Sequence, residues 1–395
     1  MKAQYDVPVF LFDRGTKKCF NHSVMKRKIR HKQGCAKGMK ATGEEIIMSV
    51  ITFVCAGQMA SALTFPAFEN GHEVRLVGSP LDREIIEGLK KDNYHITLKR
   101  TLHDGIRYYQ IEELKDALDG ADLIIGGVSS FGLDWFCDEI LPVLPEEVPL
   151  LTVTKGMVDR EDGTMVPYPY IFEERQPEGK HLNFNAIGGP CTSYELADHD
   201  NSHVAFCGKD PETLKYIRSL MATDYYHISI STDVVGVECA VALKNAYALG
   251  VTLAVGMAEK KDGKIGAQHY NSQAALFGQS MKEMGKLLDL IGGKPEHLVH
   301  GVGDLYVTVF GGRTRMIGTL LGRGLSFEEA MAELKGVTLE SIVIATRTAR
   351  AVKKLAERGL VDLKDYPLLM HIDAIINQGA EVDIPWDAFT WDDLE

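Results

Sequence analysis

Lys244 is a charged residue in a stretch that otherwise has the composition of a buried helix. From 234 to 257 the chain reads VVGVECAVALKNAYALGVTLAVGM, in which only Glu238 and Lys244 carry formal charges. Such a run predicts a helix buried on most sides. A buried ammonium finds partners or loses its proton, which makes Lys244 a candidate for proton transfer or carbonyl polarisation. The structural alternative is a core lysine that pairs with Glu238 or extends to the rim.

Other polar residues stand where ligands bind in open α/β folds. Lys155 is the lysine of the segment LLTVTKG, at the carboxyl end of a predicted buried strand. The segment GVGDLYVTVFGGRTR (301–315) places polar side chains among four glycines, and its arginines suit a phosphate. We interpret it as a phosphate site rather than a solvated loop. Helical spacing lets Lys244 and Asn245 share one cavity. The polar residues of the 301–315 segment are Asp304, Thr308, Arg313, Thr314 and Arg315.

A dinucleotide-binding turn is predicted after the first strong strand, SVITFVCAG. The GxGxxG/A register falls on Cys55, Gly57 and Ala60, at the start of a strand–helix–strand unit, where a pyrophosphate is bound. Gly57 lets the backbone approach the pyrophosphate, and Ala60 is small enough for helix–strand packing. Cys55 breaks the pattern, and its side chain is expected to crowd the turn and shift cofactor affinity. The structural alternative is a turn that serves only packing.

The end of the second strand bears on the choice of cofactor. An acid that reads the ribose 2′-hydroxyl usually ends this strand, but here the chain continues Gly78-Ser79-Pro80 and the first acid is Asp82. This pattern favours NADP over NAD. Arg83 or Arg75 would assist a 2′-phosphate, unless they are surface charges.

The elements that position these residues are strands alternating with helices, followed by helices alone. We expect strands at 49–57, 72–78, 121–129, 149–156 and 184–190, and helices at 58–71, 81–92 and 111–119. This order predicts an α/β fold with a doubly wound Rossmann-type parallel sheet. We expect residues 48–232 to form this dinucleotide-binding domain and residues 233–395 to form an all-helical substrate-binding domain.

Composition excludes several classes of protein. Residues 1–47 hold eleven Lys or Arg against four Asp or Glu, a net +7, which leaves −19 on residues 48–395. An acidic body argues against nucleic-acid binding. The basic segment resembles a nucleic-acid patch or targeting peptide, but without periodicity it is interpreted as a disordered or misassigned N-terminal extension. Seven scattered cysteines without metal-ligand spacing predict free thiols in the cytoplasm and no metal site. No membrane span is expected.

Taken together, several motifs resemble the NAD(P)-dependent glycerol-3-phosphate dehydrogenase family. They are VTKG, GGP, ECAVALKN, GVGDLYVTVFGGRTR with the following GTLLGRG, and the glutamate of VTLES, in matching order and spacing from Met48 to about residue 350. The resemblance implies a two-domain enzyme, usually a homodimer. Such an enzyme interconverts dihydroxyacetone phosphate and sn-glycerol 3-phosphate by hydride transfer with NAD(P)H and supplies glycerophospholipid synthesis.

The resemblance also assigns roles to individual residues. It makes Lys244 the catalytic lysine, with Lys155 near cofactor and substrate and Asp304 as the aspartate of the GDL element. Arg313 would contact phosphate and cofactor, and Thr308, Thr314 and Asn245 are predicted to bind the substrate. The predicted cofactor contacts are Cys55, Gly57, Gln58, Met59, Ala60, Phe131, Lys155, Ser193 of the GGPCTSYE segment, Arg313 and Glu340.

The chain departs from the family pattern at Cys55, Cys191, Thr314 and Ser341. Thr314 replaces an asparagine and loses its amide, which predicts altered phosphate binding. Two alternatives therefore remain beside the main reading. One is a related dehydrogenase acting on another phosphorylated or carboxylated keto compound, and the other is a nucleotide-binding paralogue without turnover.

In the reduction direction we expect Lys244 to stabilise the developing oxyanion and deliver a proton. Asp304 would orient its amine, and Lys155 would add positive charge. Two lysines this close are expected to depress each other's pKa.

Overall fold

The computed structural model describes residues 48–266 and 268–390. The N-terminal extension predicted at 1–47 lies outside the described residues.

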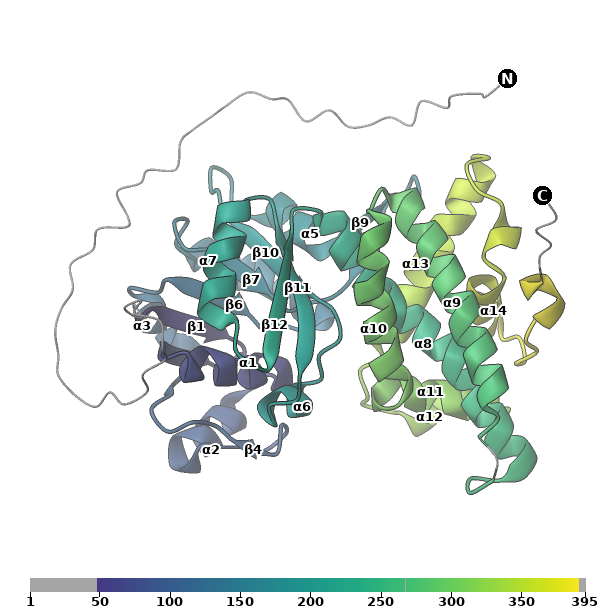
Figure 1. Ribbon diagram of the computed structural model, residues 1–395, viewed down its shortest axis with the longest axis horizontal. Coiled ribbons are helices and arrows are strands. Elements are labelled where there is room, and N and C mark those ends of the chain that lie inside the picture. The colour runs from purple at the N-terminus through teal and green to yellow at the C-terminus, as the bar shows by residue number, and fades with distance from the viewer. Residues whose placement is uncertain (1–47, 267, 391–395) are drawn as a thin grey trace. The chain divides into compact units, whose positions relative to one another are not determined.

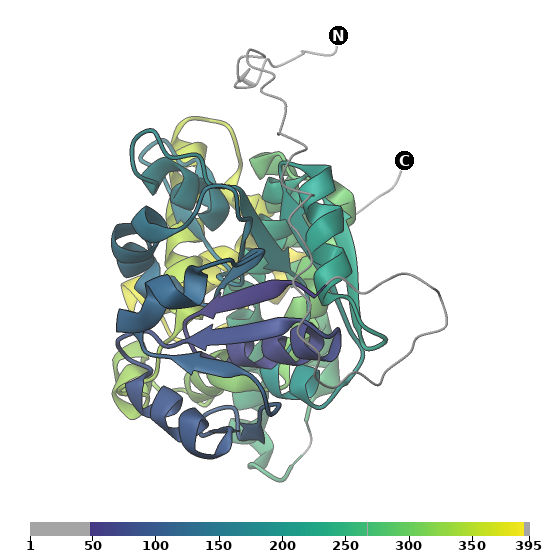
Figure 2. The same ribbon diagram turned by 90° about the vertical axis from the view of Figure 1, so that its left-hand side faces the viewer.

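A doubly wound sheet forms the first part of the described chain. Over the described residues its strands lie in the order β12-β11-β10-β7-β6-β1-β2-β5, and the neighbours from β5 to β10 pair in parallel. Figures 1 and 2 show helices on both faces of this sheet. The strands are β1 (Val50–Val54), β2 (Glu73–Val77), β5 (Arg107–Tyr109), β6 (Leu123–Gly126), β7 (Leu150–Thr152), β10 (Phe184–Gly188), β11 (Ser202–Gly208) and β12 (Tyr226–Ser231). The predicted fold class is confirmed.

Alternating side chains of the central strands divide between two apolar cores. Phe53 and Ile125 pack on one face with α1 and α7, whereas Val54 and Ile124 pack on the other with α3 and α5. This arrangement follows from the two-residue repeat of a strand that is buried on both sides. The helices of this part are α1 (Gln58–Glu69), α2 (Arg83–Asp92), α3 (Leu114–Leu118), α4 (Leu133–Trp135), α5 (Tyr168–Arg175), α6 (Ser193–Ala197) and α7 (Pro211–Met221).

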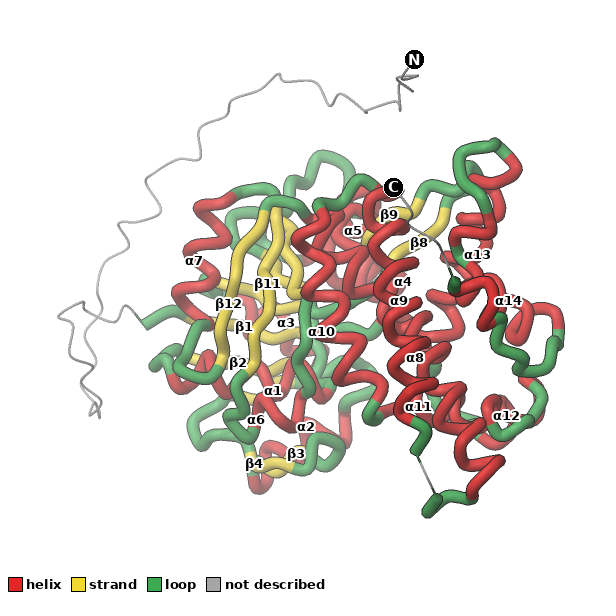
Figure 3. The backbone as a smooth tube through the Cα atoms, turned by 45° about the vertical axis from the view of Figure 1, so that its right-hand side comes forward, coloured by secondary structure: helices red, strands yellow, loops and turns green. Residues whose placement is uncertain are grey.

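The second part is built around α8 (Val234–Asp262), the helix predicted from the apolar run. Its side chains are buried almost throughout, and the surrounding helices pack against it on several sides (Figures 1 and 3). Within the described residues, only α8 is long and apolar enough to cross a membrane, yet 89% of its most apolar window is buried inside the protein, as in a core helix. The other helices are α9 (Tyr270–Ile291), α10 (Leu298–Val309), α11 (Gly312–Gly322), α12 (Phe327–Glu333), α13 (Glu340–Glu357) and α14 (Pro367–Gln378).

Several strands were not expected from the sequence. Strand β11 runs antiparallel to β10, and β12 pairs with β11 in parallel. The alternation in YHISIS was an available signal for β12. Two hairpins also lie outside the main sheet, β3 (Tyr94–His95) with β4 (Arg100–Thr101), and β8 (Met157–Asp159) with β9 (Met165–Pro167). In Figure 3 the second hairpin lies beside the helices, and β8 contacts α13.

Candidate active site

Lys244 lies in the middle of α8 and its amine is held by α10. Its Nζ donates hydrogen bonds to Asp304 Oδ1 at 3.0 Å and to Thr308 Oγ1 at 2.9 Å, and its side chain is only 12% exposed. The Thr308 hydroxyl in turn donates to the Asp304 carbonyl at 2.7 Å. The partner of Lys244 is therefore Asp304, and the alternative pairing with Glu238 does not form.

A second lysine reaches the same carboxylate from the sheet. Lys155 follows β7, and its Nζ donates to Asp304 Oδ2 at 2.5 Å and to the Gly189 carbonyl at 2.9 Å. Asp304 thus places one oxygen on each ammonium. Because the three residues come from the end of β7, from α8 and from α10, the bridge joins the sheet to the helices.

The two lysines of this bridge differ in their acidity. Burial lowers the pKa of Lys244, and the charge of Lys155 lowers it further, against the opposing effect of Asp304. Burial alone would also lower the pKa of Lys155, but the attraction of Asp304 outweighs it and the pKa is raised. The expectation that both lysines are depressed was therefore wrong for Lys155. Burial would raise the pKa of Asp304, yet the two ammonium groups hold it below its ordinary value. Lys244 is consequently the amine that gives up its proton more readily.

Two predicted substrate-binding donors have no partner among the described residues. Asn245 is 6% exposed, and its side chain makes no hydrogen bond with the described residues. Arg313 is exposed in the first turn of α11 and forms no ion pair with them. Thr314 is buried beside it, and Arg315 is engaged, because it donates to the Val309 carbonyl at 2.6 Å. The Asn245 amide group therefore offers a donor that a ligand could engage.

The small-residue turn precedes α1 as expected. Gly57 is the extended N-cap residue of α1 and provides no side-chain cap, so the first backbone N–H groups of the helix remain available to an anion. A glycine not singled out from the sequence makes the turn possible. A β-carbon on Gly127 would lie 2.4 Å from the Ala60 β-carbon and 3.2 Å from the Cys55 carbonyl oxygen. The GG pair of LIIGGVS at the end of β6 was the available signal.

The other predicted cofactor contacts come from several elements. The Gln58 amide donates to the Thr97 carbonyl at 2.7 Å, which ties the turn to the β3–β4 hairpin, and Met59 packs at the edge of an apolar core. Phe131 is 57% exposed after β6, and its neighbour Ser130 donates to Glu340 Oε1 at 2.9 Å. Ser193 is buried at the start of α6.

Cys55 occupies a backbone conformation that favours glycine. Its φ is +81°, a region that costs an L-residue about 1–2 kcal/mol. We therefore expect Cys55→Gly to be more stable than Cys55→Ala by about 1 kcal/mol in urea unfolding. Buried Cys239 in α8 is the matched control. There the alanine variant should have a free energy of unfolding about 1 kcal/mol higher than the glycine variant. The same order at both positions would contradict the strain at Cys55.

Glu238 is a fully buried carboxyl group on α8, and neither of its oxygens has a hydrogen-bond partner among the described residues. Burial raises the pKa of Glu238 from the ordinary 4.5 to about 8, although the charge of Lys155 acts in the opposite direction. Between these values the folded protein holds a proton that the unfolded chain has lost, so stability falls as pH rises through this window.

We expect Glu238→Gln to remove this loss of stability. Relative to wild type, the free energy of unfolding of the variant should rise from pH 5.5 to pH 8 by on the order of 1.4 kcal/mol per pH unit. Urea unfolding at several pH values measures the difference. A constant offset between the two proteins would show that Glu238 does not titrate in this window.

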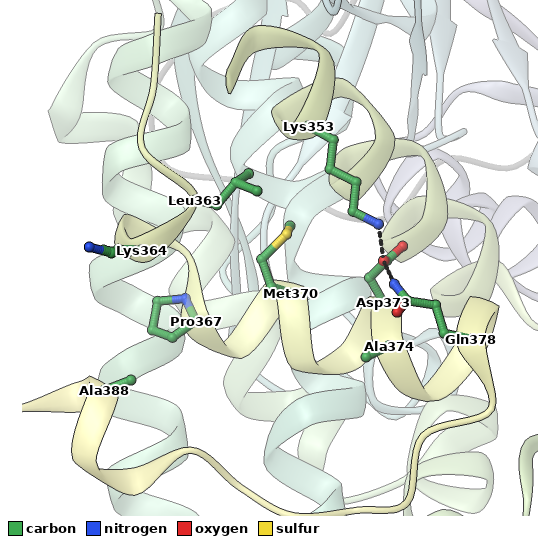
Figure 4. Close-up of a pocket in the computed structure, with 9 residues that line it drawn as sticks. All are labelled: Lys353, Leu363, Lys364, Pro367, Met370, Asp373, Ala374, Gln378 and Ala388. Carbon is green, nitrogen blue, oxygen red and sulfur yellow. Dashed lines mark hydrogen bonds and ion pairs between the residues drawn. The ribbon is translucent and has the colours of Figure 1, made fainter. Parts of the chain in front are cut away.

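A surface hollow of about 670 Å³ lies apart from these residues in the helical part (Figure 4). Lys353 and Asp373 form an ion pair on its wall, and none of the predicted site residues lines it. Its lining residues are Lys353, Leu363, Lys364, Pro367, Met370, Asp373, Ala374, Gln378 and Ala388. A much smaller hollow of about 20 Å³ does reach the site, where Lys155, Gly189 and Cys191 line it.

Comparison with known proteins covers both parts of the chain. Residues 25–214 match the family model for the N-terminus of NAD-dependent glycerol-3-phosphate dehydrogenase, and residues 233–386 match the model for its C-terminus. The NADP(+)-dependent glycerol-3-phosphate dehydrogenase of Archaeoglobus fulgidus is 29% identical, over 85% of this chain and 97% of that protein. Glycerol-3-phosphate dehydrogenase [NAD(P)+] of Shouchella clausii is 28% identical, over 80% of this chain and 89% of that protein. The crystal structure of glycerol-3-phosphate dehydrogenase from Coxiella burnetii has the same fold, with a TM-score of 0.68 and 22% identity over 87% of this chain and 98% of that one.

Proposed function

The chain belongs to the NAD-dependent glycerol-3-phosphate dehydrogenase family, and from this premise we propose that Lys244 is the proton donor of its reaction. The enzyme interconverts dihydroxyacetone phosphate and sn-glycerol 3-phosphate, using NAD or NADP. The observation that carries the proposal is the Lys244–Asp304–Lys155 bridge, in which one buried ammonium has a lowered pKa.

The cofactor fits the turn at the start of α1. Gly57, Ala60 and Gly127 leave room for the backbone to approach a pyrophosphate, and the uncapped N-terminus of α1 provides donors for it. Cys55, Gln58 and Met59 complete this turn. Phe131, Ser193, Arg313 and Glu340 are proposed to contact the rest of the cofactor. When bound, the nicotinamide supplies or accepts a hydride at the substrate carbon.

The lysines act on the substrate oxygen. As the C2 carbonyl is reduced, negative charge develops on its oxygen, and a positioned ammonium stabilises that charge and donates a proton. The Nζ–H bond of Lys244 breaks as the new O–H bond forms, which leaves a neutral amine that solvent protonates again. Asp304 fixes the direction of Lys244, and Lys155 stays charged beside it. In the oxidation direction the neutral amine takes the hydroxyl proton.

Phosphate binding is assigned mainly to two donors that have no partner within the described part of the chain. Arg313 and Asn245 are proposed to hold the phosphate with the hydroxyl groups of Thr308 and Thr314. Binding energy from this remote group would position the carbonyl beside Lys244.

We further propose that residues 48–232 bind the dinucleotide and residues 233–395 bind the substrate. The N-terminal extension at 1–47 would be dispensable for turnover, and the enzyme would act as a cytoplasmic homodimer that feeds glycerophospholipid synthesis, with no nucleic-acid partner and no membrane span. Activity and elution volume of a chain that lacks residues 1–47 test these points. An inactive truncation would contradict the dispensable extension.

The substrate assignment is tested with nicotinamide absorbance on the full chain. Dihydroxyacetone phosphate should be reduced with a far higher kcat/KM than dihydroxyacetone, which differs only by the phosphate, and than a panel of carboxylated keto compounds. Preference for one of those compounds would favour the related dehydrogenase that Thr314 suggests. Cofactor binding without any turnover would favour the binding-only paralogue.

A further inference from the structure

We propose that Asp82 reads the adenosine ribose and makes the enzyme prefer NAD(H) to NADP(H). The inference rests on the proposed role of the turn before α1 in binding the dinucleotide. It reverses the expectation of NADP(H) that the sequence at the end of β2 favours.

The Asp82 carboxylate is fixed against the dinucleotide turn. Its Oδ2 accepts hydrogen bonds from the backbone N–H of Ala56 at 3.0 Å and of Ser79 at 2.8 Å. Ala56 stands between Cys55 and Gly57 in the turn, and Ser79 follows β2. The carboxylate therefore joins the first turn to the end of the second strand, the place where an acid meets the adenosine ribose in this fold.

The segment after β2 brings Asp82 back to the end of the strand. A β-carbon on Gly78 would lie 3.2 Å from the Asp82 β-carbon and 2.6 Å from Ile86 Cγ1, so the absence of a side chain at Gly78 permits this fold. The Asp82 N–H also bonds to the Ser79 carbonyl at 2.9 Å. The residues between Val77 and Asp82 thus form a turn. Although Asp82 comes several residues after the end of β2, this turn returns it to the end of the strand, where the ribose-binding acid usually lies.

One oxygen of Asp82 remains available for a ligand. Whereas Oδ2 takes both backbone hydrogen bonds, Oδ1 accepts none from the described residues. A carboxylate oxygen only accepts hydrogen bonds, so its complement is a hydroxyl donor such as the ribose 2′-OH. A 2′-phosphate at the same place would face a fixed negative charge.

The arginines that would compensate a 2′-phosphate are engaged elsewhere. Arg83 pairs with Glu112, and Arg100 pairs with Asp198. Arg75 is buried, bonds to Glu73 at 2.8 Å and donates to the carbonyls of Ala117 and Asp119. NADP(H) would have to break one of these pairs to gain a guanidinium partner.

The test compares dissociation constants for NADH and NADPH, measured by fluorescence on the full chain, for wild type, Asp82→Asn and the control Glu84→Gln. Glu84 is an exposed acid in the first turn of α2, so the control removes one negative charge two residues from Asp82, the N-cap residue of the same helix. We expect wild type to bind NADH at least about tenfold more tightly than NADPH, and Asp82→Asn to reduce that ratio at least about tenfold. Glu84→Gln should leave it unchanged.

Preference of wild type for NADPH, or an unchanged ratio in a folded Asp82→Asn, would overturn the assignment. If that variant does not fold, the preference for a free 2′-hydroxyl is tested on wild type, by measuring how well ADP and 2′,5′-ADP displace NADH. ADP should then compete better than 2′,5′-ADP, and the reverse order would overturn the proposal. These readouts measure binding, so a failure to turn over dihydroxyacetone phosphate would contradict the proposed function without affecting them.

Discussion

Replacing Lys244 by methionine is expected to lower kcat for dihydroxyacetone phosphate reduction by about 10²–10⁴-fold. Methionine keeps an unbranched chain in the buried α8 but provides neither a charge nor a proton. The KM should change much less, since the phosphate is assigned to Arg313 and Asn245. Steady-state kinetics with saturating cofactor separate the two constants.

Lys261 is the matched control for this substitution, because it lies on the same helix but is exposed near its end. Lys261→Met should retain wild-type kinetics. If Lys244→Met kept near-normal turnover, the assignment of Lys244 as proton donor would be wrong. A large rise in KM with unchanged kcat would instead make it a binding residue.

Replacing Asp304 by asparagine is expected to reduce the free energy of unfolding by about 3–5 kcal/mol at pH 7 and to lower kcat/KM strongly. The substitution leaves Lys155 and Lys244 facing each other without the carboxylate that bonds to both. Urea unfolding measures the stability, and the pH profile of kcat/KM should move because both amines lose the anion that raises their pKa.

The lowered pKa of Asp304 also determines how its contribution to stability changes with pH. The pKa of Asp304 is lowered from the ordinary 3.8, so its contribution to stability is present above that value and is lost as pH falls through the folded-state pKa. The unfolding curves of wild type and Asp304→Asn should therefore converge in acid.

The surface pair Lys286–Asp365 provides the comparison, and Asp365→Asn should cost less than about 1 kcal/mol. In the double variant Asp304→Asn/Lys155→Met, part of the lost stability should return, because one unpaired ammonium is removed. If Asp304→Asn lowered the free energy of unfolding no more than Asp365→Asn does, the result would contradict a stabilising role of the buried Lys244–Asp304–Lys155 bridge.

Local signals were sufficient for the fold and for the positions of two lysines of the candidate site in it. The apolar run predicted α8, and Lys155 was expected at the end of a buried strand, where it follows β7. Each of these inferences needed only the periodicity or the boundary of one segment. Helix α2 begins at Arg83 rather than at the expected residue 81, because the preceding residues form the turn that ends at Asp82.

Features that depend on distant pairings were not accessible from the sequence. The role of Gly127 depends on Ala60, which lies on another element, and the unequal pKa shifts of the two lysines depend on how Asp304 divides its oxygens between them. The position of Asp82 relative to the dinucleotide turn is a further example. Its distance along the chain from β2 exceeded the usual spacing, whereas its position in space is set by the Gly78 turn and the Ala56 N–H.

Chemical rescue of Lys244→Ala tests most directly whether Lys244 delivers the proton. Truncation leaves space beside Asp304 and Thr308, which would hold the ammonium of a small added amine as they hold that of Lys244. We predict that methylamine or ethylamine restores dihydroxyacetone phosphate reduction in proportion to its concentration, with a dependence on amine pKa. Tetramethylammonium, which carries a positive charge but has no N–H proton to donate, should not restore the activity. Unrestored turnover in a folded variant that still binds cofactor and substrate, or equal rescue by tetramethylammonium, would contradict the role of Lys244.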